Sequence, residues 1–176
     1  IIVYPNPTPV ITALSTTEFC ADPGASVTLQ ATPGFNSYQW TCVSPTLPTQ
    51  PASSSPNFIA TQSGTYTVTT TNSNGCISAV SNSITVVVNP LPVASITPGS
   101  ATSFCADPGA FVTLTAGPSG NIYQWSTSGP ALGNPSLASQ NITQTGMYSV
   151  LVTNPVTNCT NTASLPVTVH PLPTPS

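Results

Sequence analysis

Two short sequences, "YQW" and "FCADPG", each occur twice in this chain. "YQW" forms residues 38–40 and 123–125, and "FCADPG" forms residues 19–24 and 104–109. Both pairs are 85 positions apart in a chain of 176 residues. Self-similarity at a fixed spacing predicts two structural repeats of about 85 residues each.

Each repeat carries the same order of short, strand-like segments. "ASVTLQA" (25–31) corresponds to "AFVTLTA" (110–116), and "GTYTV" (64–68) corresponds to "GMYSV" (146–150). Apolar residues alternate with polar ones in these segments, which is typical of half-buried β-strands. Clusters of Gly, Pro, Asn and Ser separate them, and no helical periodicity extends beyond one turn. The sequence therefore predicts an all-β fold.

The order of the segments follows an immunoglobulin-like β-sandwich. Trp40 and Trp125 would lie on the third strand, and Tyr66 and Tyr148 would form tyrosine corners at the start of the sixth. Where antibody domains place the two cysteines of their inter-sheet disulfide, the first repeat has Ala31 and Val68, and the second has Ala116 and Val150. We expect two tandem immunoglobulin-like modules whose cores pack aliphatic side chains against tryptophan.

The predicted modules span residues 5–89 and 90–170. The sequence "PLP" (90–92) joins them, and proline both lacks an N–H and fixes φ, so a stiff joint is expected. Residues 1–4, "IIVY", match the ends of the two last strands and are predicted to be the last strand of a preceding module. Residues 171–176 are interpreted as the start of a further module or a linker.

The composition excludes several classes of function. The chain has no Lys or Arg, three acidic residues (Asp and Glu together) and one His. Without cations it has no phosphate contacts, so neither nucleic-acid binding nor attachment to anionic lipid is expected. Its apolar stretches have the length of strands, so no membrane insertion is expected. Trypsin-like proteases have no cleavage site.

Five cysteines in a small β protein indicate an oxidising compartment. Four form repeat-equivalent pairs, Cys20 with Cys105 and Cys76 with Cys159. Intramodule bonds, Cys20–Cys76 and Cys105–Cys159, are one possibility. However, the turn before the second strand and the last hairpin of such a sandwich lie about 20 Å apart, whereas a disulfide needs Cα atoms within about 7 Å. An inter-module Cys20–Cys159 bond is therefore favoured, with Cys76 and Cys105 facing neighbouring modules.

Cys42 has no counterpart in the second repeat, where Thr127 holds its place. An odd cysteine in a secreted chain is either a buried free thiol or an intermolecular link. We favour a buried, unpaired thiol.

No residue pattern in the sequence supports catalysis, a metal or a cofactor. His170 occupies a linker position, and Glu18 with Asp22 would supply only part of a calcium site, which needs about six oxygens. Candidate sugar-stacking aromatics are Tyr4, Phe35 and Phe58, and core packing is the simpler interpretation of the two phenylalanines. Asn141 and Asn158 begin N-glycosylation sequons, which would mark surface loops.

These motifs, with "VVVNPLP" (86–92) and "VTVHPLP" (167–173) closing the repeats, resemble the tandem immunoglobulin-like and PKD-like repeats of large Bacteroidetes-type secreted surface proteins, including gliding adhesins. The resemblance implies a non-enzymatic, extracellular segment of a fibre or cell-surface adhesin stalk. Its partners would be neighbouring modules or copies of itself. The alternative is an adhesion module that binds surface glycans or a protein.

Overall fold

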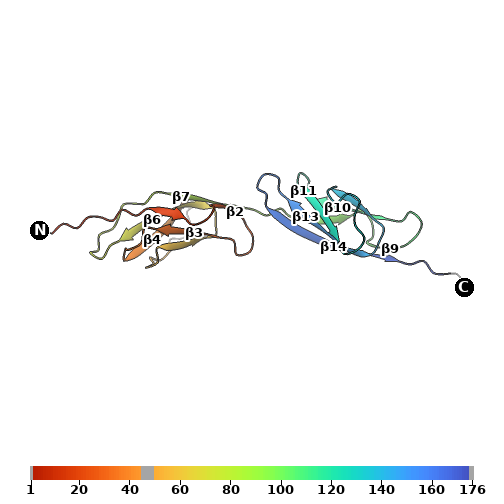
Figure 1. Ribbon diagram of the computed structural model, residues 1–176, viewed down its shortest axis with the longest axis horizontal. Helices are drawn as coiled ribbons and strands as arrows, with labels where there is room; N and C mark the ends of the chain where they lie inside the picture. Colours follow the sequence, from red (N-terminus) through yellow and green to blue (C-terminus); the bar gives the residue numbers. More distant parts are fainter. Residues whose placement is uncertain (1, 45–49, 175–176) are drawn as a thin grey trace. The chain divides into compact units, whose positions relative to one another are not determined.

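The computed structural model describes residues 2–44 and 50–174, which form two compact units (Figure 1). The units are Ile1–Asn89 and Pro90–Ser176, called module 1 and module 2 below. The division falls immediately before the "PLP" sequence. Because a proline cannot donate to a strand ladder, the last strand of module 1 ends there.

Module 1 is a sandwich of two sheets. One sheet has the order β1-β3-β5 and the other the order β2-β7-β6-β4. The strands are β1 (Ile11–Ala13), β2 (Glu18–Cys20), β3 (Val27–Ala31), β4 (Ser37–Ser44), β5 (Asn57–Ala60), β6 (Gly64–Thr71) and β7 (Ile84–Asn89).

Module 2 repeats this arrangement. Its sheets have the orders β12-β10-β8 and β11-β13-β14-β9. The strands are β8 (Ser95–Pro98), β9 (Ser103–Cys105), β10 (Val112–Gly117), β11 (Ile122–Thr127), β12 (Ser139–Ile142), β13 (Gly146–Thr153) and β14 (Thr160–His170). The described residues thus form four sheets in two all-β, immunoglobulin-like sandwiches, which confirms the predicted fold class.

In each module the chain changes sheet between its first two strands. β1 pairs antiparallel with β3, whereas β2 pairs parallel with β7, the last strand. β8 and β9 do the same with β10 and β14. This crossover brings each "FCADPG" sequence beside the end of the last strand, with Cys20 opposite Asn89 and Cys105 opposite His170.

A tryptophan lies at the centre of each core. Trp40 and Trp125 are each only 3% exposed. Trp40 stacks on Phe58 at a centroid distance of 5.4 Å, and Phe58 lies 5.5 Å from Tyr66. The Trp125 indole N–H donates to the Leu137 carbonyl over 2.8 Å, whereas that of Trp40 has no hydrogen-bond partner within the described residues.

Aliphatic side chains fill the places of the inter-sheet cysteines. Ala31, Val68, Ala116 and Val150 are all buried and belong to the two core clusters. Burial of these apolar side chains stabilises the core at the positions where antibody domains have a disulfide bond.

The two tyrosine corners have matching geometry. The Tyr66 hydroxyl donates to the Gln62 carbonyl over 2.9 Å, and the Tyr148 hydroxyl donates to the Gln144 carbonyl over 2.9 Å. Both acceptors lie four residues upstream of the tyrosine. Each bond fixes the loop that enters the sixth strand of its module.

Residues 2–4 lie in no strand of this structure, and the side chains of Ile2, Val3 and Tyr4 are exposed. Their pairing as the last strand of a neighbouring module stays a prediction.

Candidate functional site

The two "FCADPG" sequences form turns with nearly identical geometry. In module 1 the Ala21 N–H donates to the Asn89 carbonyl and the Ala25 N–H to the Asp22 carbonyl, each over 2.9 Å. In module 2 the corresponding bonds, from Ala106 to His170 and from Ala110 to Asp107, are also 2.9 Å long. This shared structure is called the FCADPG turn.

A glycine allows this turn to close. Gly24 has a φ of 82° and Gly109 a φ of 81°, in the left-handed region that residues with a Cβ rarely adopt. The preceding proline fixes its own φ. The dipeptide "PG" therefore closes the turn that follows each cysteine, and strand pairing with Asn89 or His170 places the cysteine beside the last strand.

The other cysteine of each repeat lies in a turn capped by asparagine, between the last two strands. In module 1 the Asn72 side-chain oxygen accepts from the N–H groups of Asn74 and Cys76, over 3.0 and 2.9 Å. In module 2 the Asn154 oxygen accepts from Val156 and Thr157, over 2.9 and 3.2 Å. We call this structure, residues 72–76 and 154–159, the asparagine-capped turn.

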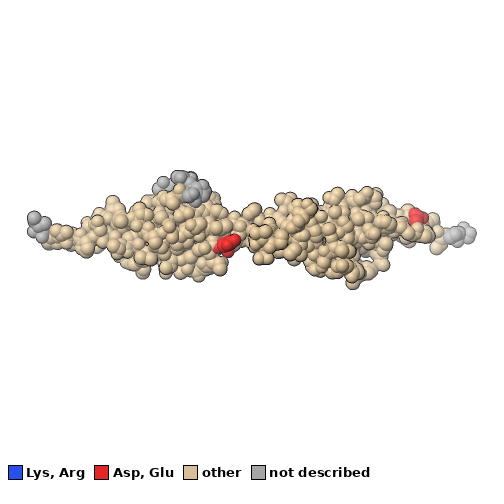
Figure 2. All heavy atoms as spheres, turned by 90° about the horizontal axis from the view of Figure 1, so that it is seen from above, with Lys and Arg blue, Asp and Glu red and all other residues tan. Residues whose placement is uncertain are grey.

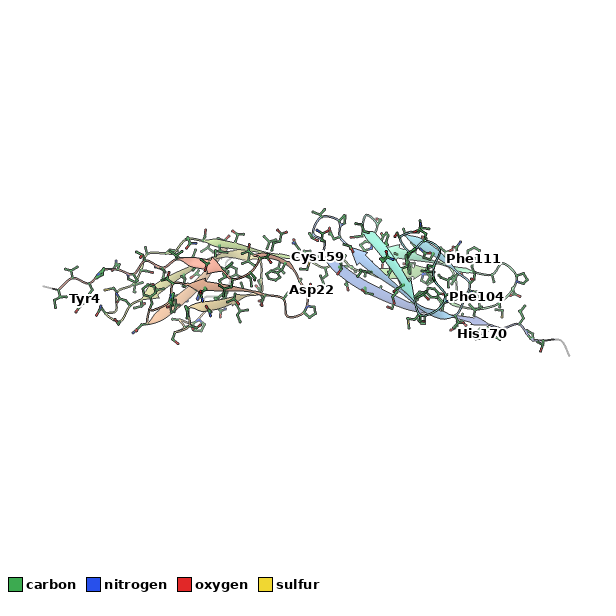
Figure 3. The ribbon with its side chains drawn as sticks, in the orientation of Figure 1. Tyr4, Asp22, Phe104, Phe111, Cys159 and His170 are labelled. Atoms are coloured by element: carbon green, nitrogen blue, oxygen red, sulfur yellow. The ribbon has the colours of Figure 1, made fainter. Side chains whose placement is uncertain are left out.

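Within a module the two turns lie at opposite ends of the sandwich. Cys159 immediately precedes β14, and Cys105 pairs with His170 at the far end of that strand. Ten steps of about 3.3 Å along a strand place these two cysteines roughly 33 Å apart. Figure 3 accordingly shows Cys159 at one end of module 2 and His170 at the other.

The structure divides the cysteines into two groups. Cys20 and Cys159 are disulfide-bonded. Cys42, Cys76 and Cys105 are free thiols. The intramodule alternatives, Cys20–Cys76 and Cys105–Cys159, are therefore not formed, because each requires a cysteine that is free. The inter-module Cys20–Cys159 bond stays a prediction.

Cys42 is buried in the core of module 1, where it is 6% exposed. Its neighbour across β4 and β6 is Tyr66. Burial raises the pKa of the Tyr66 phenol, and the Cys42 thiol raises this pKa further. Burial also raises the pKa of Tyr148, although a hydrogen bond with Thr127 partly offsets that effect. Both phenols therefore stay protonated donors at neutral pH.

The ionisable groups do not gather into a site. No cluster of three or more His, Cys, Asp or Glu occurs in the part of the chain that the structure describes. The Glu18 carboxylate accepts a hydrogen bond from the Asn89 amide over 3.0 Å. His170 shares a 2.9 Å hydrogen bond with the Ser103 hydroxyl. These two contacts tie the first residue of β2 and the first residue of β9 to the end of the adjacent last strand.

Of the three aromatic candidates for sugar stacking, two pack on the core. Phe58 lies between Trp40 and Tyr66, and Phe35 makes an edge contact with Tyr38 at 6.1 Å. Tyr4, 48% exposed, is accessible.

The two sequon asparagines are exposed, but their settings differ. Asn141 lies on β12, where its side-chain oxygen accepts from the Thr113 hydroxyl over 2.8 Å. Asn158 has a φ of 58° within the asparagine-capped turn. Glycosylation at either position stays a prediction.

Module 2 has a shallow depression of about 160 Å³ beside Leu132, Gln140 and Tyr148. Gln140 is buried, and its amide donates to the Asn134 carbonyl over 2.7 Å. The residues lining this depression include no carboxylate, histidine or cysteine. The one phenol in the lining, that of Tyr148, is held in its tyrosine-corner hydrogen bond to the Gln144 carbonyl.

No family model matches the sequence, and no curated protein matches it significantly. Among solved structures, three N-terminal domains of the bacteriophage RB49 highly immunogenic outer capsid protein are similar at 18% identity and a TM-score of 0.42. That match covers 92% of this chain and 59% of the other, so this chain spans less than two thirds of it. The ligand-binding domain of human OSCAR (19%, TM-score 0.37) and murine CEACAM1b (15%, TM-score 0.37) each match over 92% of this chain and 99% of theirs.

At these identities the likeness is one of fold. None of the described segments forms a helix with the length and hydrophobicity that crossing a bilayer requires.

Proposed function

We propose that this chain is a structural segment of an extracellular fibre or cell-surface adhesin stalk, without enzymatic activity. The observation that carries the proposal is the pair of cysteine-bearing turns at opposite ends of each sandwich, with one cysteine of each module in a disulfide. The resemblance of the repeat motifs to those of Bacteroidetes-type surface proteins favours the same role.

In this proposal Cys20 of module 1 is bonded to Cys159 of module 2. The support is that these two cysteines are disulfide-bonded while the other three are free thiols. Cys20 lies in an FCADPG turn and Cys159 in an asparagine-capped turn. The bond would pass tension from one module to the next without relying on the linker alone.

The surface chemistry supports an exposed extracellular location. Figure 2 shows an almost uniformly uncharged face, with a little red for Asp and Glu, and the sequence contains no Lys or Arg. A chain without Lys or Arg resists trypsin-like proteases. Disulfides persist in oxidising compartments such as the cell exterior.

Peptide mapping without reduction tests the pairing. Free thiols are first alkylated in denaturant with iodoacetamide, and the chain is then cut with chymotrypsin. Aromatic residues lie between every two successive cysteines, so each cysteine falls in its own peptide. We expect a linked pair that contains Cys20 and Cys159, with Cys42, Cys76 and Cys105 alkylated. A peptide joining Cys20 to Cys76, or alkylated Cys20, would overturn the proposal.

A further inference from the structure

We infer that Cys105 and Cys76 are the joining sites for a second copy of this chain, with Cys105 of one copy bonded to Cys76 of the next. The inference rests on the proposed function, because it extends the Cys20–Cys159 pairing to the repeat-equivalent cysteines. It adds a partner, a direction of assembly and a covalent bond.

The first support is the equivalence of Cys105 and Cys20. Each lies third in a three-residue strand that pairs parallel with the last strand of its module. The hydrogen bonds of the two FCADPG turns agree in length, and the two glycine φ angles differ by 1°. Cys20 is disulfide-bonded in this setting, whereas Cys105 is an exposed free thiol.

The second support is the equivalence of Cys76 and Cys159. Both end an asparagine-capped turn, and each carbonyl accepts from the N–H of the capping asparagine, over 3.1 Å for Cys76 and 2.9 Å for Cys159. The turn of module 1 is one residue shorter and has Gly75, with a φ of 80°, where module 2 has Asn158. Cys159 is disulfide-bonded, whereas Cys76 is a half-buried free thiol.

The residues beside the two free thiols are more apolar than those beside their bonded equivalents. Phe111, 52% exposed, follows the turn of Cys105, where module 1 has Ser26. Ile77, 64% exposed, follows Cys76, where module 2 has Thr160. Figure 3 shows Phe104, Phe111 and His170 at the same end of module 2. Docking would remove both exposed apolar side chains from water.

The two joining surfaces differ from each other, so the contact is heterologous. A heterologous contact that does not close into a ring generates an open filament. Electrostatic repulsion is small, since Asp107 is the single carboxylate side chain of module 2 and Cys76 lies in a turn without ionised side chains. Assembly would therefore proceed end to end.

The bond forms by thiol–disulfide exchange with a small disulfide such as oxidised glutathione. One protein thiolate attacks glutathione disulfide and releases one glutathione. The second protein thiolate then attacks the mixed disulfide and releases another. Two protein thiols lose two protons and two electrons, and one glutathione disulfide becomes two glutathione molecules.

The test incubates the native chain with oxidised glutathione and separates the products by non-reducing electrophoresis. We expect a ladder of dimers, trimers and longer species that a reductant collapses. Chymotryptic maps of the ladder bands should contain a linked peptide pair with Cys76 and Cys105. The Cys42→Ser variant is the matched control, and its ladder should be unchanged because Cys42 is buried.

Paired variants give the test its direction. Neither Cys76→Ser nor Cys105→Ser alone should form a ladder, whereas a mixture of the two should stop at dimers. The Phe111→Ser variant introduces the serine that module 1 has at the equivalent position, Ser26. It should slow ladder formation several-fold without changing the number of free thiols.

The contradicting outcomes are distinct. Glutathione attached to Cys76 and Cys105 without oligomers, or a ladder from Cys105→Ser alone, would overturn this inference. In both cases a peptide map of the monomer band tests the Cys20–Cys159 pair separately. Absence of that pair from the monomer would instead overturn the proposed function.

Discussion

Replacing Leu114 by alanine is expected to lower the free energy of unfolding of module 2 by about 3 kcal/mol and to leave module 1 unchanged. Leu114 is fully buried on β10 and belongs to the core cluster of module 2. Losing its side chain removes apolar burial and leaves a cavity. Hydrogen exchange, read by peptide in each module, should show protection in module 2 falling by about 100-fold, since 1.4 kcal/mol corresponds to tenfold.

The neighbouring Thr115 provides the matched control. It is exposed on the same strand, and its hydroxyl shares a 3.0 Å hydrogen bond with that of Ser139. The Thr115→Ala variant should change stability by less than about 0.5 kcal/mol. Equal loss of protection in both modules of the Leu114→Ala variant would show that the modules share one cooperative core, against the description of two separate cores.

The double variant Ala116→Cys with Val150→Cys is expected to form an inter-sheet disulfide and to stabilise module 2 by about 3 to 4 kcal/mol. Both positions are buried in the same core, and they correspond to the inter-sheet cysteines of antibody domains. The bond would close a loop of roughly 35 residues, for which chain entropy gives a stabilisation of this size. Urea unfolding of module 2, before and after reduction, measures it.

Two controls accompany this measurement. The unmodified chain is reduced in parallel, because reduction also breaks the disulfides of Cys20 and Cys159. The Ala116→Cys, Val152→Cys variant places the second thiol two residues further along β13 and should not form the bond. If the displaced pair oxidised readily and the first pair did not, the alignment with the antibody fold would be wrong.

Side-chain periodicity and motif order were sufficient to predict the sandwich. Trp40 and Trp125 are buried, and the hydroxyls of Tyr66 and Tyr148 bond four residues upstream, as a tyrosine corner requires. These features depend on local sequence patterns that both repeats carry. Because the sequence repeats, each of these features was predicted once in each module, from different residues.

The change of sheet between the first two strands of each module could not be predicted in the same way. β2 and β9 are three residues long, and a parallel pair with a distant last strand leaves no alternating pattern in so short a segment. The sequence also predicted residues 1–4 to be the last strand of a preceding module; residues 2–4 lie in no strand here, and that pairing stays a prediction. A strand forms only where a partner strand satisfies its backbone groups.

The states of the cysteines lay partly beyond sequence reasoning. Cys20 and Cys105 have the same six-residue context, yet one is disulfide-bonded and the other is a free thiol. Local sequence determines the turn that presents the sulfur atom, whereas the bond depends on which thiol lies opposite. That second requirement concerns three-dimensional proximity, which no local pattern encodes.

Single-molecule stretching of the chain by its two ends is the most direct test of the proposal that a disulfide links the two modules of a structural segment. A Cys20–Cys159 bond encloses roughly 140 residues, which would add on the order of 480 Å when fully extended. We predict that the oxidised chain never gains this length and that reduction, or the Cys20→Ser change, releases it. Extension of the oxidised chain to its full contour length would contradict the account.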